Sequence, residues 1–214
     1  MMMHAKLEDF FSLEEFAHKV LWEEGEKIWS PLLVMDRYLS QYTAKIEIKV
    51  PKHAYLDLPN LISIGKGTVI EPGVYIQGPC IIGKNCILRH GAYLRGGVIL
   101  GDCCVVGHAT EVKHSIFLNY AAAAHFTYVG DSILGNSVNL GAGVKCANLR
   151  LDRRPVMPGL AKLGAILGDR AQVGCNAVLN PGTFVGKEAI IYPLQLVKGM
   201  ILPGQQITGK INVS

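Results

Sequence analysis

Long apolar runs are missing from this 214-residue chain, and no apolar stretch approaches the about 18 residues that a membrane-spanning helix requires. No two cysteines form a Cys-X-X-Cys pair, which excludes zinc-ribbon and thioredoxin-like motifs. Charged residues make up only 18% of the chain, the net charge is +4, and like charges do not cluster in runs. This balance argues against a nucleic-acid-binding protein. We therefore expect neither a membrane nor a nucleic acid among its partners.

What the chain does contain is aliphatic surface, because half of its residues are apolar while only 7% are aromatic. Such a composition predicts a packed protein rather than a disordered one. Phe10 and Phe11 run directly into Glu14 and Glu15, which is not a signal-peptide pattern, so we expect a reducing, cytoplasmic location. The small positive balance suits small anionic ligands such as phosphate esters.

Aliphatic residues recur at every sixth position along the middle of the chain. These anchors are Ile64, Ile70, Ile76, Ile82, Leu88, Leu94, Leu100, Val106 and Val112. The position four residues after an anchor is small or β-branched, as in Thr68, Val74, Cys80, Cys86, Ala92, Val98, Cys104 and Thr110. Glycine often follows an anchor, as at Gly65 and Gly83, where we expect a corner that needs its freedom to turn. The register resumes at Leu134 and again from Leu167 to Val197.

A period of six fits neither an amphipathic helix nor an alternating strand, and it predicts a coil of short parallel strands. If three hexads form one triangular turn, residues 18 apart stack at the strand spacing of about 4.8 Å. Cys86 and Cys104 then stack inside the coil as packing residues, and Cys103 points outward. We expect an all-β chain, with a parallel β-helix over residues 61–214 and an N-terminal helical cap and linker over residues 1–60.

The expected cap is read from two helix-start signals. Ser12 with Glu15 forms a capping box before an apolar stripe that includes Phe16 and Leu21. Ser30 followed by Pro31 is a second start signal. We expect one or two helices within residues 12–42 that cap the open end of the solenoid, and a first coil near residue 62.

Two segments break the six-residue register, from Lys113 to about Ile133 and from Cys146 to about Lys162. Because regular coils present a flat wall, we expect a binding site where the regularity is lost. Both segments contain polar side chains suited to chemistry, including His125, Asn139 and Asn148.

The hexads, together with HFTYVGDSILGNSVNLGAG beginning at His125, resemble left-handed parallel β-helix acyltransferases. The similarity is to the acetyltransferase domain of the bifunctional N-acetylglucosamine-1-phosphate uridyltransferase and glucosamine-1-phosphate acetyltransferase family. ANLRLD, and IYP near residue 192, are similar to its archaeal-type sugar-1-phosphate nucleotidyltransferase branch. Over residues 60–200, the resemblance implies left-handed winding, against the usual crossover rule, and a homotrimer with sites between subunits.

The resemblance also implies residue roles, with acetyl-coenzyme A as co-substrate and no metal. It implies a catalytic base at His125, oriented by Glu111, and cofactor contacts at Ala142 and Cys175. It implies substrate contacts at Arg89, Lys113, Tyr128, Asn139, Asn148 and Lys162. The residue types suit the chemistry, since a histidine with a pKa near 6.5 accepts the proton of an attacking amine. Cations at fixed positions pair with a sugar phosphate.

The function expected from the resemblance is transfer of acetyl from acetyl-coenzyme A to the amine of a hexosamine 1-phosphate. Three alternatives stay open. The first is a nucleotide-sugar-pathway protein that is homologous to UDP-N-acetylglucosamine pyrophosphorylase but lacks its nucleotidyltransferase domain. The glycine-rich L-x-[AG]-G-x-[GS]-T-R signature of that domain is absent from this sequence. Another is a non-catalytic trimeric scaffold. The third is a zinc enzyme similar to carbonic anhydrases, in which His90 and His108 stack and His114 completes the ligand set.

Overall fold

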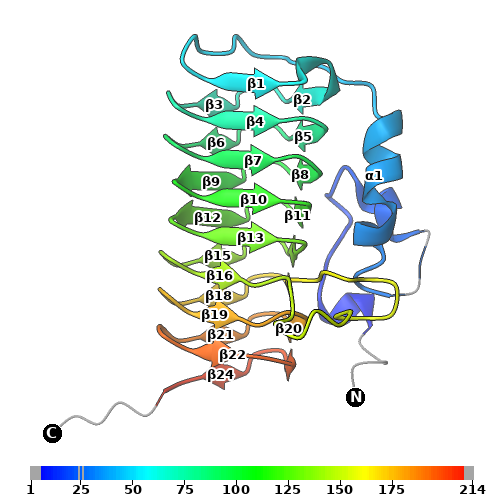
Figure 1. The fold of residues 1–214 in the computed structure, drawn as a ribbon, viewed down its shortest axis with the longest axis vertical. Helices are drawn as coiled ribbons and strands as arrows, with labels where there is room; N and C mark the ends of the chain where they lie inside the picture. The colour runs from blue at the N-terminus through cyan, green and yellow to red at the C-terminus, as the bar shows by residue number, and fades with distance from the viewer. Residues whose placement is uncertain (1–5, 24, 26, 210–214) are drawn as a thin grey trace, which may run out of the picture.

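The computed structural model describes residues 6–23, 25 and 27–209, and these form a triangular parallel β-solenoid with three faces of eight strands each (Figure 1). Face 1 consists of β1 (Tyr55–Asp57), β4 (Tyr75–Gln77), β7 (Tyr93–Arg95), β10 (Glu111–Lys113), β13 (Tyr128–Gly130), β16 (Lys145–Cys146), β19 (Val178–Leu179) and β22 (Leu196–Val197). Face 2 consists of β2 (Ile62–Ile64), β5 (Cys80–Ile82), β8 (Val98–Leu100), β11 (Ser115–Phe117), β14 (Ile133–Leu134), β17 (Ala165–Leu167), β20 (Thr183–Val185) and β23 (Met200–Ile201). Face 3 consists of β3 (Val69–Ile70), β6 (Ile87–Leu88), β9 (Val105–His108), β12 (Ala122–His125), β15 (Asn139–Leu140), β18 (Gln172–Val173), β21 (Ile190–Ile191) and β24 (Gln206–Ile207).

The solenoid winds to the left, as the resemblance implied. In Figure 1, β4 and β7 on the near face run from left to right, and β9 on the far face runs back while successive coils descend. The corner residues Asn85 and Cys103 have left-handed backbones, with φ of 54° and 59°. The coil begins earlier than the expected residue 62. Strand β1 already belongs to the first coil, and Ile46 forms an isolated bridge with Ile64.

The predicted ladders form the interior. Each anchor from Ile64 to Val112 is at most 5% exposed, and the small positions between Thr68 and Thr110 are buried as well. Glycine follows an anchor for a reason other than turning. A Cβ on Gly65 would lie 2.6 Å from the backbone of Gly83, so the coils approach too closely there for a side chain.

The register is lost over the first predicted segment, but the coil is not interrupted, because residues 113–133 continue it as β10 to β14. Val112 lies 18 residues after its partner Leu94 and 17 residues before its partner Val129. Val129 in turn lies 17 residues before its partner Cys146, so two successive coils are each shorter by one residue. The missing residue is at the corner between faces 1 and 2. Gly96 and Gly97 occupy that corner in one coil, and His114 occupies it alone in the next. A one-residue deletion at this corner in each of two successive coils shifts the hexad register without unwinding the chain.

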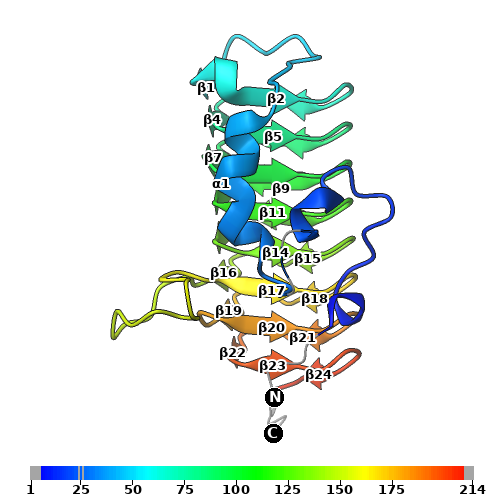
Figure 2. The same ribbon diagram turned by 90° about the vertical axis from the view of Figure 1, so that its right-hand side faces the viewer.

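The second interruption is a true insertion. Residues 147–164 leave the solenoid between β16 and β17 and project from it as a loop (Figure 2). The coil resumes in register beyond the loop, since Leu134 pairs with Leu167.

The N-terminal segment covers face 2 rather than an open end of the solenoid, so the expected position of the cap is wrong (Figures 1 and 2). Helix α1 (Pro31–Gln41) begins at Pro31, directly after Ser30, as predicted. The capping box at Ser12 starts no α-helix, because the Ser12 amide donates to Asp169 Oδ2 at 2.8 Å. The remaining helical turns are the 3-10 helices η2 (Leu7–Asp9), η3 (Lys19–Trp22) and η4 (Pro59–Leu61). Among the described residues, no helix combines the length and apolar character that membrane crossing requires.

Aromatic and aliphatic side chains attach this segment to the solenoid. Phe10 and Trp29 both contact the ring of Phe184 on face 2, with centroids 6.4 and 5.6 Å apart. Isoleucines from successive face 2 strands, including Ile99 and Ile116, point outward into the same apolar cluster. Among the residues that the structure describes, no such segment covers face 1 (Figure 1).

Candidate functional site

His125 ends β12 at the corner between faces 3 and 1, and its side chain is exposed. In successive coils the same corner position is occupied by His90, His108, His125, Ala142 and Cys175, which we call the corner column. Gly143 N donates to His125 O at 3.0 Å, and Asn176 N donates to Ala142 O at 2.8 Å. The structure therefore places the predicted base directly above the two residues predicted to contact the cofactor.

Phe126 and Lys145 fix the backbone around His125. Phe126 has a φ of 52° and packs its ring on His108 with centroids 5.2 Å apart. The Lys145 ammonium donates to Phe126 O at 3.3 Å and to Gly143 O at 2.6 Å. Lys145 is a neighbour of the candidate base that sequence reasoning missed. The signal that could have found it is the register of the coil, in which Lys145 is the strand partner of Tyr128.

Tyr128 and Asn148 meet above Gly130 on face 1. A Cβ on Gly130 would lie 2.7 Å from both Asn148 Nδ2 and the Tyr128 hydroxyl, so glycine at this position leaves room for the two side chains. Burial raises the pKa of Tyr128, and the nearby Glu111 carboxylate raises it further. The Tyr128 phenol is therefore a neutral hydrogen-bonding group at physiological pH.

The buried carboxylate of Asp131 organises the next corner of the coil. It accepts a hydrogen bond from Asn148 Nδ2, and its oxygens lie 3.2 Å from His114 Nδ1 and 3.4 Å from Lys113 Nζ. Burial raises the pKa of Asp131, but the contacts with His114, Asn148 and Lys113 outweigh burial and hold that pKa below its usual value. Asp131 thus ties two predicted substrate contacts, Lys113 and Asn148, to one ionised group.

The Glu111 carboxylate pairs with Arg95 rather than with the candidate base. Its Oε1 accepts a hydrogen bond from Arg95 Nη1 at 2.7 Å. Within the described ranges, the His125 ring makes no hydrogen bond or ion pair. No contact therefore supports the predicted role of Glu111 in orienting the His125 imidazole.

The other predicted contacts lie apart from face 1. Arg89 directly follows β6 and Asn139 begins β15, so both belong to face 3. Lys162 is exposed in the inserted loop. Lys113, Tyr128 and Asn148 are thus gathered on face 1, while His125, Ala142 and Cys175 line its edge.

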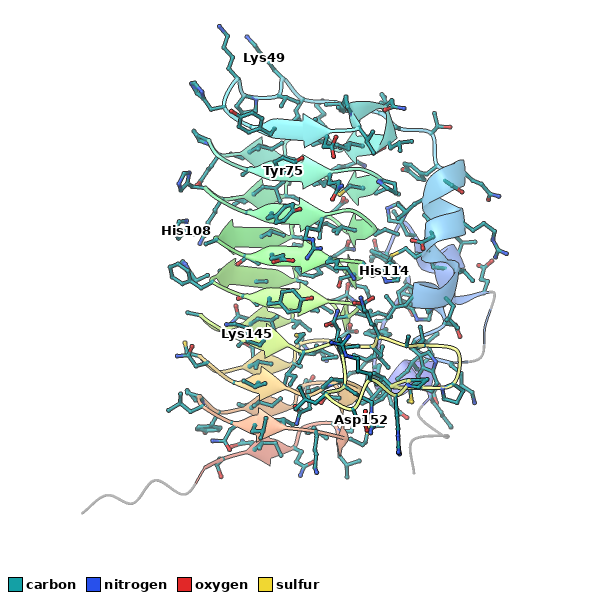
Figure 3. All side chains as sticks on the ribbon, in the orientation of Figure 1. Lys49, Tyr75, His108, His114, Lys145 and Asp152 are labelled. Atoms are coloured by element: carbon teal, nitrogen blue, oxygen red, sulfur yellow. The ribbon has the colours of Figure 1, made fainter. Side chains whose placement is uncertain are left out.

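The three histidines of the zinc alternative do not converge. His90 and His108 stack as predicted, with ring centroids 5.5 Å apart and planes 12° apart. His114 lies at the opposite corner of face 1, against Asp131, as the labels of His108 and His114 in Figure 3 show. The alternative of a zinc site made of these three imidazoles is therefore wrong, because the fold keeps His114 away from the other two.

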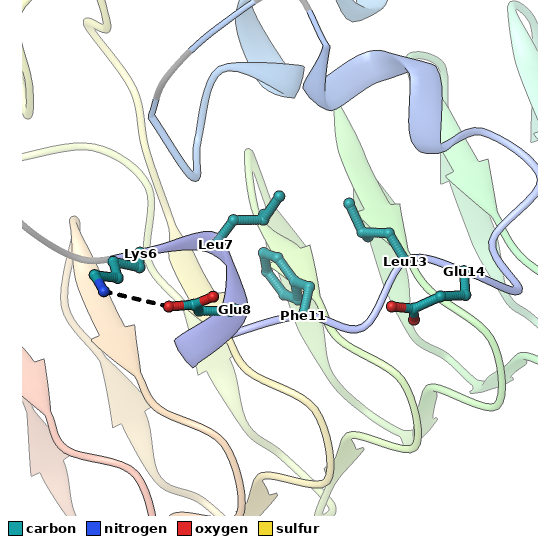
Figure 4. A pocket seen from close by; sticks show the side chains of 6 residues that line it. All are labelled: Lys6, Leu7, Glu8, Phe11, Leu13 and Glu14. Carbon is teal, nitrogen blue, oxygen red and sulfur yellow. Dashed lines mark hydrogen bonds and ion pairs between the residues drawn. The ribbon is translucent and has the colours of Figure 1, made fainter.

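One surface hollow lies away from the residues described above. It has a volume of about 390 Å³ and is formed by the N-terminal segment, where Leu7, Phe11 and Leu13 line it beside the ion pair of Lys6 and Glu8 (Figure 4). None of its lining residues belongs to the predicted site.

Comparison with known proteins identifies relatives in sequence and in fold. The model of the bacterial transferase hexapeptide family matches residues 62–96. The chain is 39% identical over 178 residues to the bifunctional protein GlmU of Methanococcus maripaludis, covering 79% of this chain and 43% of that protein. It is 30% identical to the putative uncharacterized acetyltransferase YaiX of Escherichia coli, covering 77% of this chain and 76% of that protein. The chain spans less than half the length of its archaeal relative.

Solved structures share the fold. The UDP-N-acetylglucosamine acyltransferase of Francisella novicida superposes with a TM-score of 0.57 over 75% of this chain and 63% of that one. At 17% sequence identity, this likeness concerns the solenoid alone.

Proposed function

The chain belongs to the hexapeptide-repeat acyltransferase family, and from this premise we propose that it transfers acetyl from acetyl-coenzyme A to the amine of a hexosamine 1-phosphate. The observation that supports this most strongly is the position of His125. Its exposed imidazole belongs to the corner column and stands at the edge of face 1, the face that carries Tyr128, Asn148 and Lys113.

His125 acts as the general base. The acceptor amine attacks the thioester carbon, the imidazole takes the amine proton, and the coenzyme thiolate leaves and is protonated in turn. The imidazole has no competing partner among the described side chains, so its ring nitrogens are available to the acceptor. Lys145 holds the carbonyls of the two corners next to His125 and so fixes the backbone that carries the base.

The acceptor lies along face 1. His125 and Gly130 are separated by five residues, so their Cα atoms are at most about 17 Å apart. Lys113 is the strand partner of Gly130 and extends its ammonium over the same face. A sugar ring over Tyr128 and Asn148 then presents its amine to His125 and its phosphate to Lys113.

The donor lies along the corner column below His125. Ala142 and Cys175 carry short side chains, and Gly141 and Gly143 flank Ala142. This part of the column therefore has space for a narrow pantetheine arm beside the base. The unpaired state of all six cysteines fits a reducing compartment, and we place the protein in the cytoplasm.

A homotrimer would complete the site. Phe126 is 54% exposed beside His125, and Leu194 and Leu196 are more than 70% exposed near the same corner. A second copy of the chain that covers this apolar edge would exclude water from the reaction. Light scattering after size exclusion tests this, and a stable monomer would contradict a site shared between subunits.

The experiment that tests the function is a thiol-release assay with acetyl-coenzyme A and a panel of amino-sugar phosphates. We expect turnover of a hexosamine 1-phosphate, and at least a roughly 100-fold loss of kcat in His125→Ala. His90→Ala is the matched control, because it removes an exposed imidazole from the same column two coils away. Equal turnover by wild type and His125→Ala would exclude His125 as the base, and no turnover of any amino sugar would favour the scaffold alternative.

A further inference from the structure

Lys145 is a cation held directly at the corner that carries the candidate base. It begins β16 on face 1, close to the corner between faces 3 and 1 (Figure 3). Its Nζ donates to Phe126 O at 3.3 Å and to Gly143 O at 2.6 Å. Phe126 directly follows His125, and Gly143 directly follows Ala142. One ammonium therefore contacts the residue next to the base and the residue next to the predicted donor contact.

The charge of this ammonium is not neutralised by a carboxylate within the part of the chain that the structure describes. By contrast, the ammonium groups of Lys113 and Lys187 lie 3.4 and 3.9 Å from the carboxylates of Asp131 and Asp169. The partners of Lys145 are carbonyl oxygens, which orient an ammonium without cancelling its charge. Lys145 therefore presents a full positive charge at an exposed position.

One donor of the Lys145 ammonium is left for a ligand. An ammonium has three N–H groups, and the two corner carbonyls accept from two of them. The third points away from both carbonyls and toward solvent, because the side chain is exposed. Since Nζ is bonded to the carbonyl of the residue after His125, it lies at most about 10 Å from the His125 Cα. An acetyl group beside the imidazole is within reach of this donor.

An oriented cation at this position suits the charge that develops during acyl transfer. The amine nitrogen forms a bond to the thioester carbon, and the π electrons of the C=O bond move onto oxygen as an oxyanion. When the C=O bond re-forms, the C–S bond breaks, its electron pair leaves with the coenzyme sulfur, and the amine proton passes to His125. A preoriented donor at such an oxyanion contributes about 100- to 1,000-fold to kcat.

We infer that Lys145 is a catalytic residue whose ammonium donates to the carbonyl oxygen of the bound thioester and stabilises the oxyanion. The inference rests on the proposed function, and it gives Lys145 a contact with the reacting atoms in addition to its hold on the backbone. The carbonyls of Phe126 and Gly143 fix the ammonium before the charge appears, so little reorganisation is needed during the reaction.

The first test is the infrared spectrum of acetyl-coenzyme A, isotope-labelled at its acetyl carbonyl and bound to the full chain without an acceptor. Donation from an ammonium weakens the C=O bond, so the carbonyl stretch should lie at lower frequency on the wild type than in solution. Lys145→Met should remove this shift, and Lys145→Arg should keep part of it. Lys84→Met is the matched control, because it removes the same charge from an exposed lysine on the corner between faces 2 and 3.

The second test is steady-state kinetics with a hexosamine 1-phosphate. Lys145→Met should lower kcat about 100-fold and change the KM for acetyl-coenzyme A little, because the oxyanion exists only in the transition state. Lys145→Arg retains a cation and should recover about tenfold of this loss. Lys84→Met should have the kcat of the wild type.

The outcomes separate this inference from the proposed reaction. A carbonyl frequency that Lys145→Met leaves unchanged would overturn the inference, whether or not kcat falls, and would leave acetyl transfer standing. Equal effects in Lys84→Met would also overturn it, since the cause would then be net charge. A lowered frequency that depends on Lys145, in a chain that acetylates no hexosamine phosphate, would support the role of Lys145 and reject the proposed acceptor. A chain that binds no acetyl-coenzyme A would overturn both.

Discussion

His114 and Asp131 occupy the same corner of successive coils as single residues, both with left-handed backbones, and His114 Nδ1 lies 3.2 Å from Asp131 Oδ1. Each of the two coils lacks one residue at this corner, whereas the preceding coil has two glycines there, Gly96 and Gly97. The corner therefore joins helix α1, through Asp36, to the residues that hold Lys113 and Asn148.

Asp131→Asn should destabilise the protein by about 2 kcal/mol at pH 7, because it removes the charge that three donors share. The folded pKa of Asp131 is lowered, so its stabilising contribution is present above the unfolded pKa near 3.9 and is lost as pH falls through the folded pKa. The difference in Tm between the wild type and Asp131→Asn should become smaller as the pH falls below about 4. Asp152→Asn, at an exposed carboxylate, should shift Tm little, and an equal effect at both sites would contradict the role of Asp131.

His18 should make stability depend on pH in a different range. Burial lowers the pKa of His18 from 6.5 to about 4, and its Nδ1 pairs with the Tyr38 hydroxyl at 2.7 Å. His18 becomes protonated below pH 6.5 in the unfolded chain but only below about pH 4 in the folded chain. The free energy of unfolding therefore falls by about 3 kcal/mol in total as the pH drops from 6.5 to 4. In His18→Gln, the free energy of unfolding should change little between pH 7 and pH 4. If it instead falls as steeply as in the wild type, other groups cause the loss of stability.

Gly107→Ala should destabilise the solenoid by more than about 3 kcal/mol, because the new Cβ would lie 1.6 Å from Ala124 O and would force two coils apart. Gly204→Ala is the matched control. It also adds one methyl group and has a left-handed φ of 69°, but no atom lies within 4 Å of the added Cβ, so it should cost only about 1 kcal/mol. Denaturant unfolding of both variants measures the difference, and similar midpoints would contradict the close approach of the coils.

A thiol reagent should modify Cys175 first in the native protein, because this thiol is exposed whereas Cys80, Cys104 and Cys146 are buried. Burial raises the pKa of Cys146 to about 12, which further slows its reaction. Acetyl-coenzyme A should protect Cys175 if the donor lies along the corner column. Cys175→Ser should remove the fast phase, and labelling that acetyl-coenzyme A leaves unchanged would place the donor elsewhere.

The sequence predicts the coil because its inward positions obey a strict period, from Ile64 to Val112. The position of the N-terminal segment was missed, although a signal for it exists. The middle residues of the face 2 strands, such as Ile81, Ile99 and Ile116, are apolar although they point outward. Strands that are apolar on both sides require a cover, whereas the face 1 strands from β1 to β10 carry polar or tyrosine side chains outside.

The residues of the candidate site were predicted one by one from a sequence motif. The motif does not predict which of these residues lie close together in the fold. The hexad places Arg89 and Lys113 on different faces once coil positions are counted, so a shared contact with one phosphate is not implied by their order along the chain. Arg95 and Lys145 belong to no recognised motif. Their proximity to Lys113 and His125 follows from strand pairing. The pairing depends on which coils are one residue shorter, and a hexad count alone does not resolve this.

The contact of Ser12 and Phe10 with Asp169 joins the beginning of the chain to a late coil, since Phe10 O also accepts from Asp169 N at 2.8 Å. Solenoids bonded only between neighbouring coils can fray from either end, repeat by repeat. Here a strap that crosses face 2 spans several coils at once, so the late coils cannot peel away without detaching it. The molecule should therefore melt as one cooperative block, although its ladders repeat in only one dimension.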